Sequence, residues 1–143
     1  MIIDRLSLKD FEKIKPLLND YKSSIKEDQL TAEQFRELKN AIKNEKITFY
    51  NAVIKDEIVA MCSISTAFST YNCQALGIFE DFYIKPSYRG KGLAAKLTDF
   101  VFGDMKKRNI ETVWVGCADV DVNMYKHLGF NLVLGNLLAW CSS

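Results

Sequence analysis

The 143-residue sequence contains one histidine, two prolines and no closely spaced pair of cysteines. With His127 as the sole histidine, a metal site built from several imidazoles is excluded. The cysteines show no C-x-x-C spacing, which argues against a zinc site or a redox dithiol. We therefore predict no metal site, and we expect four buried structural thiols, at Cys62, Cys73, Cys117 and Cys141.

A surplus of charge and a long apolar run are also missing. The sequence has 19 basic and 18 acidic side chains, a net charge of +1, whereas a protein built to hold nucleic acid needs a basic surplus. No apolar run is long enough to cross a bilayer, and residues 1–4 do not begin a signal peptide. We therefore expect a cytoplasmic protein with neither a membrane nor a nucleic-acid partner.

What is present is a composition typical of one globular domain, which we expect to span residues 1–143. Hydrophobic residues make up 48% and charged residues 26%, and a chain of this length can bury its own core.

After a short strand at Met1–Arg5, Ser7 is a candidate N-cap for a helix that Pro16 should kink or shorten. That helix has an apolar face at three- and four-residue steps, formed by Leu8, Phe11, Ile14, Leu18 and Tyr21. A capping box at residues 31–34 begins a second helix.

The middle of the sequence is typical of antiparallel strands. Ile47–Ile54 and Glu57–Thr66 flank a short turn at Lys55-Asp56, which predicts a hairpin. The turn has no glycine, so its type stays open. Gln74–Ile84, rich in aromatic and β-branched residues, predicts the next strand.

The last third predicts a different arrangement. A long helix beginning near Gly92 and ending near Arg108 leads to an apolar strand at Thr112–Ala118, which makes a right-handed parallel βαβ unit. A short helix at Val120–Leu128 and two further strands follow, at Phe130–Leu134 and Leu137–Cys141. The predicted fold class is α/β (α+β), with a mixed, mostly antiparallel sheet, one parallel βαβ crossover and helices on both faces.

Arg89-Gly90-Lys91-Gly92 lies between a predicted strand and a predicted helix. Helix N-termini carry free N–H groups and a positive dipole end, and glycines let a phosphate approach them. A tight turn that needs only glycine is the simpler interpretation of the same residues. A dinucleotide site is a third, because Gly90, Gly92 and Ala95 fit G-x-G-x-x-A and Asp119 follows the next strand. That site needs several parallel βαβ units, and only one is predicted.

Two segments resemble motifs of the GCN-five-related N-acetyltransferase (GNAT) family. Phe82–Ala94, with Arg89-Gly90-Lys91-Gly92-Leu93-Ala94 at its centre, resembles motif A, and Met124–Phe130, which reads MYKHLGF, is similar to motif B. The order of elements also fits, so the resemblance spans essentially the whole chain. Asp119 departs from an asparagine that is frequent in motif B, which affects one family contact to the cofactor. Phe79–Ile84 also looks like a strand of the polyamine and diamine acetyltransferase branch.

The resemblance implies acetyl-CoA as the acetyl donor. Backbone N–H groups of Gly90–Ala94 would hold its pyrophosphate, and Phe82–Ile84 would pair with the pantetheine arm like an added strand. The implied cofactor-binding residues are Phe82, Tyr83, Ile84, Arg89, Gly90, Lys91, Gly92, Leu93 and Ala94.

Acetyl transfer to an amine is helped by a general base that deprotonates the ammonium and a general acid that protonates the leaving thiolate. Glu80 is the candidate base by its position in the strand before the loop, and Tyr125 is the candidate acid because it matches the tyrosine of motif B. In a regular strand Asp81 faces away from Glu80, unless a bulge intervenes. His127 is expected at the surface or in packing, and covalent catalysis by Cys117 is disfavoured because no histidine is placed to activate it.

The function that these residues predict is direct transfer of an acetyl group from acetyl-CoA to a primary amine of a small molecule, with a polyamine or diamine as one candidate. Two alternatives stay open, a protein or peptide acceptor and a non-catalytic acyl-CoA-binding module. A homodimer is also open, since the apolar stretch Leu137–Trp140 suits either an interface or a core.

Overall fold

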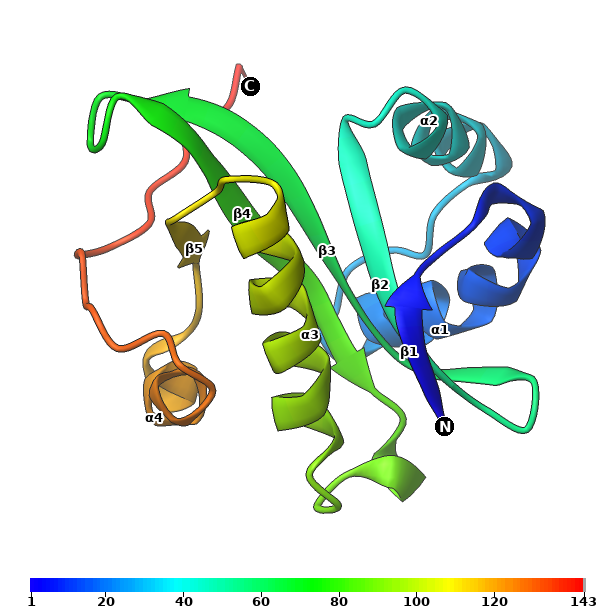
Figure 1. The fold of residues 1–143 in the computed structure, drawn as a ribbon. Coiled ribbons are helices and arrows are strands. Elements are labelled where there is room, and N and C mark those ends of the chain that lie inside the picture. Colours follow the sequence, from blue (N-terminus) through cyan, green and yellow to red (C-terminus); the bar gives the residue numbers. More distant parts are fainter. Residues whose placement is uncertain (143) are drawn as a thin grey trace.

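The computed structural model describes residues 1–142, which build a five-stranded sheet in the order β1-β2-β3-β4-β5 (Figure 1). Every neighbouring pair is antiparallel except β4 and β5, which are parallel. The strands are β1 (Ile2–Arg5), β2 (Ile47–Ile54), β3 (Glu57–Ser69), β4 (Gln74–Ile84) and β5 (Val113–Val115). The predicted fold class is confirmed, and the single parallel pair removes the dinucleotide-binding interpretation, which requires several.

Helices cover both faces of the sheet and bury a separate apolar cluster on each. On one face α3 (Leu93–Lys107) packs through Leu97 and Val101 onto Ile64 and Phe79. On the other face lie α1 (Phe11–Ser24) and α2 (Ala32–Lys43) (Figure 1). A short helix, α4 (Val122–His127), follows β5, with single 3₁₀ turns at Leu8–Asp10, Pro86–Tyr88 and Asp119–Asp121.

Helix α1 continues through Pro16, so the proline does not shorten the helix at that position. The helix begins at Phe11 after a 3₁₀ turn, so Pro16 falls in its second turn. Burial of Phe11, Ile14 and the two following leucines against the sheet offsets the lost hydrogen bond. The Ser7 side chain does not cap a backbone N–H; its hydroxyl donates to Asp10. The capping box at Thr31 and Gln34 is present as predicted.

The predicted hairpin is formed by β2 and β3, and its turn uses two residues with positive φ. Lys55 has φ 51° and Asp56 has φ 63°, while Ile54 pairs with Glu57 across the turn. Left-handed backbone at both central positions is the mark of a type I′ turn, whose twist matches the flanking strands. The missing glycine therefore did not prevent the turn that glycine usually favours.

Strand β4 contains a bulge and then separates from β5. Met61 pairs with Tyr83 whereas Ser63 pairs with Glu80, so one residue of β3 faces two of β4, Asp81 and Phe82. Asp81 lies at φ 55°. The parallel pairing with β5 covers only Gly77–Phe79, and β4 continues beyond it alone. This leaves one backbone edge of β4 open from Glu80 onward.

The C-terminal part of the chain differs most from prediction. Strand β5 is shorter than the expected Thr112–Ala118, and neither Phe130–Leu134 nor Leu137–Cys141 forms a strand. From α4 the chain runs past β5 without pairing with it (Figure 1). Strand propensity alone does not make a strand, which requires pairing with a neighbouring backbone, and these residues pair with none in the described part of the chain.

Two further expectations concern the burial of the cysteines and the length of apolar segments. Cys62 is buried as predicted, but Cys73, Cys117 and Cys141 are exposed, so the prediction of four buried thiols is wrong for three. Within residues 1–142, no helix combines the length and apolar character that spanning a bilayer requires.

Candidate functional site

The loop between β4 and α3 has the backbone of an anion cradle. Gly90 and Gly92 lie at φ +75° and +79°, and a Cβ at either position would meet no atom within 4 Å. Gly92 is the N-cap of α3 and has no side chain to accept from the first-turn N–H groups. A helix N-terminus with free N–H groups and open space before it suits a phosphate. The sequence-based prediction for Gly90–Ala94 thus has a matching geometry.

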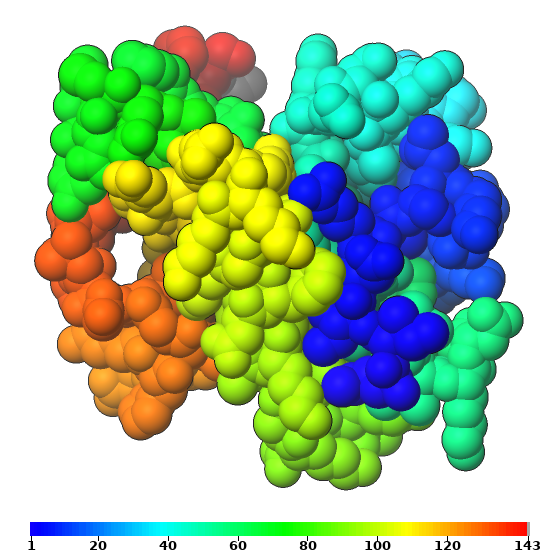
Figure 2. Space-filling view, viewed as in Figure 1, coloured from blue at the N-terminus to red at the C-terminus, as the bar shows by residue number. Residues whose placement is uncertain are grey.

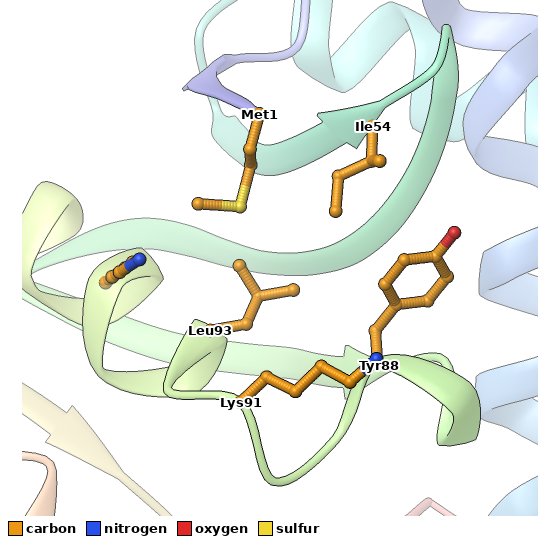
Figure 3. A pocket seen from close by; sticks show the side chains of 6 residues that line it. Met1, Ile54, Tyr88, Lys91 and Leu93 are labelled. Carbon is orange, nitrogen blue, oxygen red and sulfur yellow. The ribbon is translucent and has the colours of Figure 1, made fainter.

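The two cations of this loop are not equivalent. Arg89 turns back onto β4, where its Nε donates to the Ile84 carbonyl at 2.8 Å and its guanidinium lies 5.2 Å from the Tyr83 ring centre. The Lys91 ammonium lies 5.7 Å from the Tyr88 ring centre. It borders a shallow pocket of about 80 Å³ on the β2 side of α3, between the loop and Met1 (Figure 3). That pocket lies on the side of α3 away from β5.

Phe82, Tyr83 and Ile84 occupy the part of β4 that β5 does not pair with. Their open edge leads toward the glycine loop, so an extended pantetheine arm has backbone groups to pair with, as an added strand does. The side chains alternate: Phe82 and Ile84 pack on the α3 side and Tyr83 packs on the α1 side.

The bulge brings Glu80 and Asp81 to the same face of the sheet, contrary to the expectation for a regular strand. The Ser63 hydroxyl donates to the Asp81 carboxylate at 2.5 Å, and Ser63 and Glu80 are paired neighbours. The extra residue of a bulge shifts the alternation of side chains, and aspartate tolerates the left-handed backbone needed there.

Both carboxyl groups hold their protons more strongly than usual. Burial raises the pKa of Glu80, and the charge of Asp81 raises it further, while Lys22 acts in the opposite direction. Burial also raises the pKa of Asp81, although the Ser63 hydrogen bond and Lys22 lower it. Two acids that share one environment in this way are suited to proton transfer near neutral pH.

Three residues from α1 and the following loop complete this acidic region. Lys22 Nζ bonds the Glu27 carboxylate at 2.9 Å, and the Tyr21 ring centre lies 6.1 Å from that of Tyr83. Burial and the charges of Asp81, Glu27 and Glu80 raise the pKa of Tyr21 to about 12. Sequence reasoning treated Tyr21 only as part of an apolar helix face and did not single out Lys22, Glu27 or Ser63, because no local motif marks them.

Tyr125 lies on the opposite side of β4, in a cluster of aromatic rings. Its ring centre is 6.1 Å from Phe82, 6.4 Å from Phe79 and 5.7 Å from Phe130. Burial raises the pKa of the Tyr125 phenol, and the nearby Asp121, Cys117 and Tyr21 raise it further. The phenol is therefore protonated at neutral pH, as a proton donor must be.

The remaining candidates are peripheral. His127 is exposed, and its Nδ1 lies 2.6 Å from the Asn123 carbonyl oxygen in its own helix. Asp119 begins an exposed 3₁₀ turn. Within the described residues no cluster of three metal-ligating side chains exists.

A model of a protein family matches the part of the chain that contains this site. The Acetyltransferase (GNAT) family model matches residues 11–130, which include both the glycine loop and Tyr125. The chain belongs to the GNAT acetyltransferase family. It is an acetyl-CoA-dependent acetyltransferase, and the motif resemblance is confirmed. The cradle at Gly90 and Gly92, with its open space, fits the cofactor that the family uses.

Solved structures share the fold of this acetyltransferase at low sequence identity. A predicted acetyltransferase from Clostridium acetobutylicum with acetyl-CoA is 20% identical at a TM-score of 0.80, covering 96% of this chain and 94% of that one. An aminoglycoside acetyltransferase from an uncultured soil metagenomic sample is 15% identical at 0.85, covering 99% and 95%. The ribosomal-protein-alanine N-acetyltransferase of Brucella melitensis is 15% identical at 0.75, covering 100% and 99%. A search of curated protein sequences finds no match.

Proposed function

We propose that this acetyltransferase acetylates a primary amine of a small cationic molecule, with diamines and polyamines as the substrate class. The observation that carries the proposal is the bulge of β4, which sets Glu80 and Asp81 side by side on one face. Glu27 adds a third carboxylate to this region, and Lys22 is the cation that pairs with Glu27 and lowers the pKa of both acids. A surplus of negative charge attracts a substrate with more than one ammonium group.

Glu80 is the general base of the proposed reaction. Its raised pKa makes it a better proton acceptor than an ordinary carboxylate, and it is more exposed than Asp81. Asp81 is held by Ser63, and its role is to keep the pKa of Glu80 high and to bind the ammonium of the acceptor.

When acetyl-CoA is bound it supplies an activated thioester carbonyl. The N–H groups of Gly90–Ala94 would hold its pyrophosphate, and the open edge of Phe82–Ile84 would orient the arm along β4. Glu80 would take one proton from the acceptor ammonium, so that the free amine could attack the thioester carbonyl and the new C–N bond could form as the C–S bond breaks. Tyr125 would give its phenolic proton to the departing sulfur, and the second proton released by the attacking nitrogen would restore the phenol. The Tyr125 ring, buried among Phe79 and Phe82, keeps water away.

The test is a mass-spectrometric screen of purified protein with acetyl-CoA against polyamines, amino acids, aminoglycosides, arylamines and peptides. Mass detection avoids the background that three exposed cysteines cause with thiol-reactive dyes. Addition of one acetyl group to diamines or polyamines, in preference to monoamines, is the expected result. Acetylation of peptides alone would contradict the small-molecule assignment, and equal rates with neutral amino compounds would contradict the role of the acidic region.

A further inference from the structure

Lys22 brings a primary amine into the acidic region of β4. It lies near the C-terminal end of α1, and its charge acts on both Glu80 and Asp81. The residue before it, Tyr21, has its ring centre 6.1 Å from that of Tyr83, in the middle of the β4 segment that β5 leaves unpaired. The last turns of α1 therefore place a lysine ammonium beside the proposed base and next to the open edge of β4.

The end of α1 has a backbone geometry that holds Lys22 in this place. Lys26 has φ 61°, its N–H donates to the Ser23 carbonyl at 3.2 Å, and the Glu27 N–H donates to the Lys22 carbonyl at 2.9 Å. These two bonds form a Schellman motif, in which an apolar contact frequently accompanies the second bond. Here the two side chains form an ion pair instead, with Lys22 Nζ 2.9 Å from the Glu27 carboxylate.

This ion pair leaves the Lys22 side chain free to turn. The side chain of Glu27 is 52% exposed, and an ion pair open to water contributes little stability. A lysine ammonium sits on a flexible four-carbon stem. Nζ can therefore leave Glu27 and turn toward Glu80 while the backbone of the motif stays in place.

Other lysines near the glycine loop lie elsewhere. Helix α3 and its lysines cover the face of the sheet opposite to α1, and Figure 2 shows this helix in yellow-green and yellow across the front of the molecule. Lys91 borders the pocket beside α3, and Lys85 is paired with Glu57. Lys22 is the lysine whose charge acts on the two acids.

We propose that Lys22 is a self-acetylation site, at which the chain transfers the acetyl group of bound acetyl-CoA to its own Nζ when no acceptor amine is present. The role of Glu80 as the base is taken from the proposed function. Glu80 would take one proton from the Nζ ammonium and release it to solvent. The free amine would attack the thioester carbonyl, the C–N bond would form as the C–S bond breaks, and a second Nζ proton would end on the departing sulfur by way of Tyr125. The product is a neutral amide that keeps one N–H, and Glu27 loses its ion-pair partner.

The test is incubation of the full chain with acetyl-CoA and no acceptor, followed by intact-mass measurement and peptide mapping. Cleavage before aspartates leaves Lys22 and Lys26 in one peptide, residues 20–27, and fragmentation assigns the acetyl group to one of them. Lys26 is exposed and is the matched control. We expect Lys22 to react at least about 100-fold faster than Lys26, the lower end of what a positioned base contributes. The rate should not depend on protein concentration, and an added diamine should slow it.

Two variants complete the test. Glu80→Gln should slow the acetylation of Lys22 to the rate of Lys26. Lys22→Arg keeps the charge but has no primary amine, so its mass gain should be smaller by one acetyl group. Binding of acetyl-CoA by each variant shows that the domain remains folded, and the comparison of Lys22 with Lys26 is made in the wild type and requires no variant.

Equal rates at Lys22 and Lys26 overturn the proposal, as does a Lys22 rate that Glu80→Gln leaves unchanged or that rises with protein concentration. Acetylation of diamines by a chain whose Lys22 stays unmodified overturns self-acetylation and leaves the proposed function in place. Acetylation of Lys22 that depends on Glu80, in a chain that acetylates no small amine, supports self-acetylation and contradicts the proposed substrate class.

Discussion

Two regions of the acetyltransferase hold partly buried acidic side chains, and the pKa values of these side chains shift in opposite directions in the two regions. On α3, Asp104 accepts hydrogen bonds from the Arg5 guanidinium, at 2.6 Å, and from the buried Tyr50 hydroxyl. On β4, Glu80 and Asp81 lie beside each other with Lys22 as their cation.

The pKa values follow the partners rather than the residue type. Burial by itself would raise the pKa of Asp104, but the hydrogen bonds from Arg5 and Tyr50 outweigh it and lower the pKa. For Glu80 and Asp81 burial prevails and the pKa of each rises. Through its hydrogen bonds Asp104 links β1, β2 and α3. Glu80 and Asp81, whose pKa values are raised, are instead suited to accept and release protons.

Substitution of Glu80, the proposed base on β4, should have the largest effect on activity. We expect Glu80→Gln to lower kcat/KM by about 100- to 10,000-fold near neutral pH, the range for a lost general base. Asp81→Asn is the matched comparison, since asparagine tolerates the same positive φ and can still accept from Ser63. It should cost less activity and move the acid limb of the pH profile to lower pH, because the charge that raises the pKa of Glu80 is gone. An Asp81→Asn loss as large as that of Glu80→Gln would assign the base to Asp81.

Substitution of Tyr125, the proposed proton donor, should have the next largest effect on activity. Tyr125→Phe should reduce kcat by about 10- to 100-fold, the lower part of the range for a lost general acid. Acetyl-CoA affinity should stay nearly unchanged, because the ring keeps its packing against Phe79 and Phe82. Steady-state kinetics and a binding titration measure the two quantities, with Tyr71→Phe on the exposed β3–β4 loop as the control. Unchanged turnover would remove Tyr125 from the mechanism.

Substitution of Asp104, the paired acid on α3, should lower the stability of the protein and leave its activity unchanged. Asp104→Asn is expected to lower the free energy of unfolding by about 1–3 kcal/mol, the cost of weakening a buried hydrogen-bonded network. Because the pKa of Asp104 is lowered by folding, its stabilisation is complete above the ordinary carboxyl pKa and is lost as pH falls through the lowered value. The difference from wild type should therefore shrink in acid.

Denaturant titrations over a pH series measure this difference. Asp99→Asn, an exposed position on the same helix, is the control and should leave stability unchanged at every pH. A reduced turnover of folded Asp104→Asn would contradict the separation of the two regions.

The smallest expected effect concerns Lys22. Its charge lowers the pKa of both Glu80 and Asp81, so Lys22→Met should move the acid limb of kcat/KM to higher pH. Lys26→Met, an exposed lysine in the next loop, should leave the profile in place. An unshifted limb in Lys22→Met would show that Lys22 does not act on the base.

Local signals were enough to predict much of the fold. Thr31 and Gln34 form the capping box, the alternation along β2 and β3 predicts the hairpin, and the glycines at 90 and 92 mark the turn into α3. Each of these depends on interactions between residues close in sequence, which is why the sequence alone was sufficient. The glycine loop and Tyr125 became site candidates by the same means, since both lie in contiguous motifs.

Tertiary structure decided the rest. The bulge at Asp81 depends on how β3 and β4 align over their length, so strict alternation placed Asp81 on the wrong face. Lys22 and Glu27 lie near the acids because α1 packs across β3 and β4, and Ser63 meets Asp81 because β3 pairs with β4. The apolar residues after Phe130 have the composition of strands, but a strand needs a paired neighbouring backbone, and within the described part of the chain these residues pair with none. The sequence by itself determined most of the elements and the glycine loop before α3, which depend on residues close in the chain; the long-range pairing of strands decided which charges meet and which edge stays open.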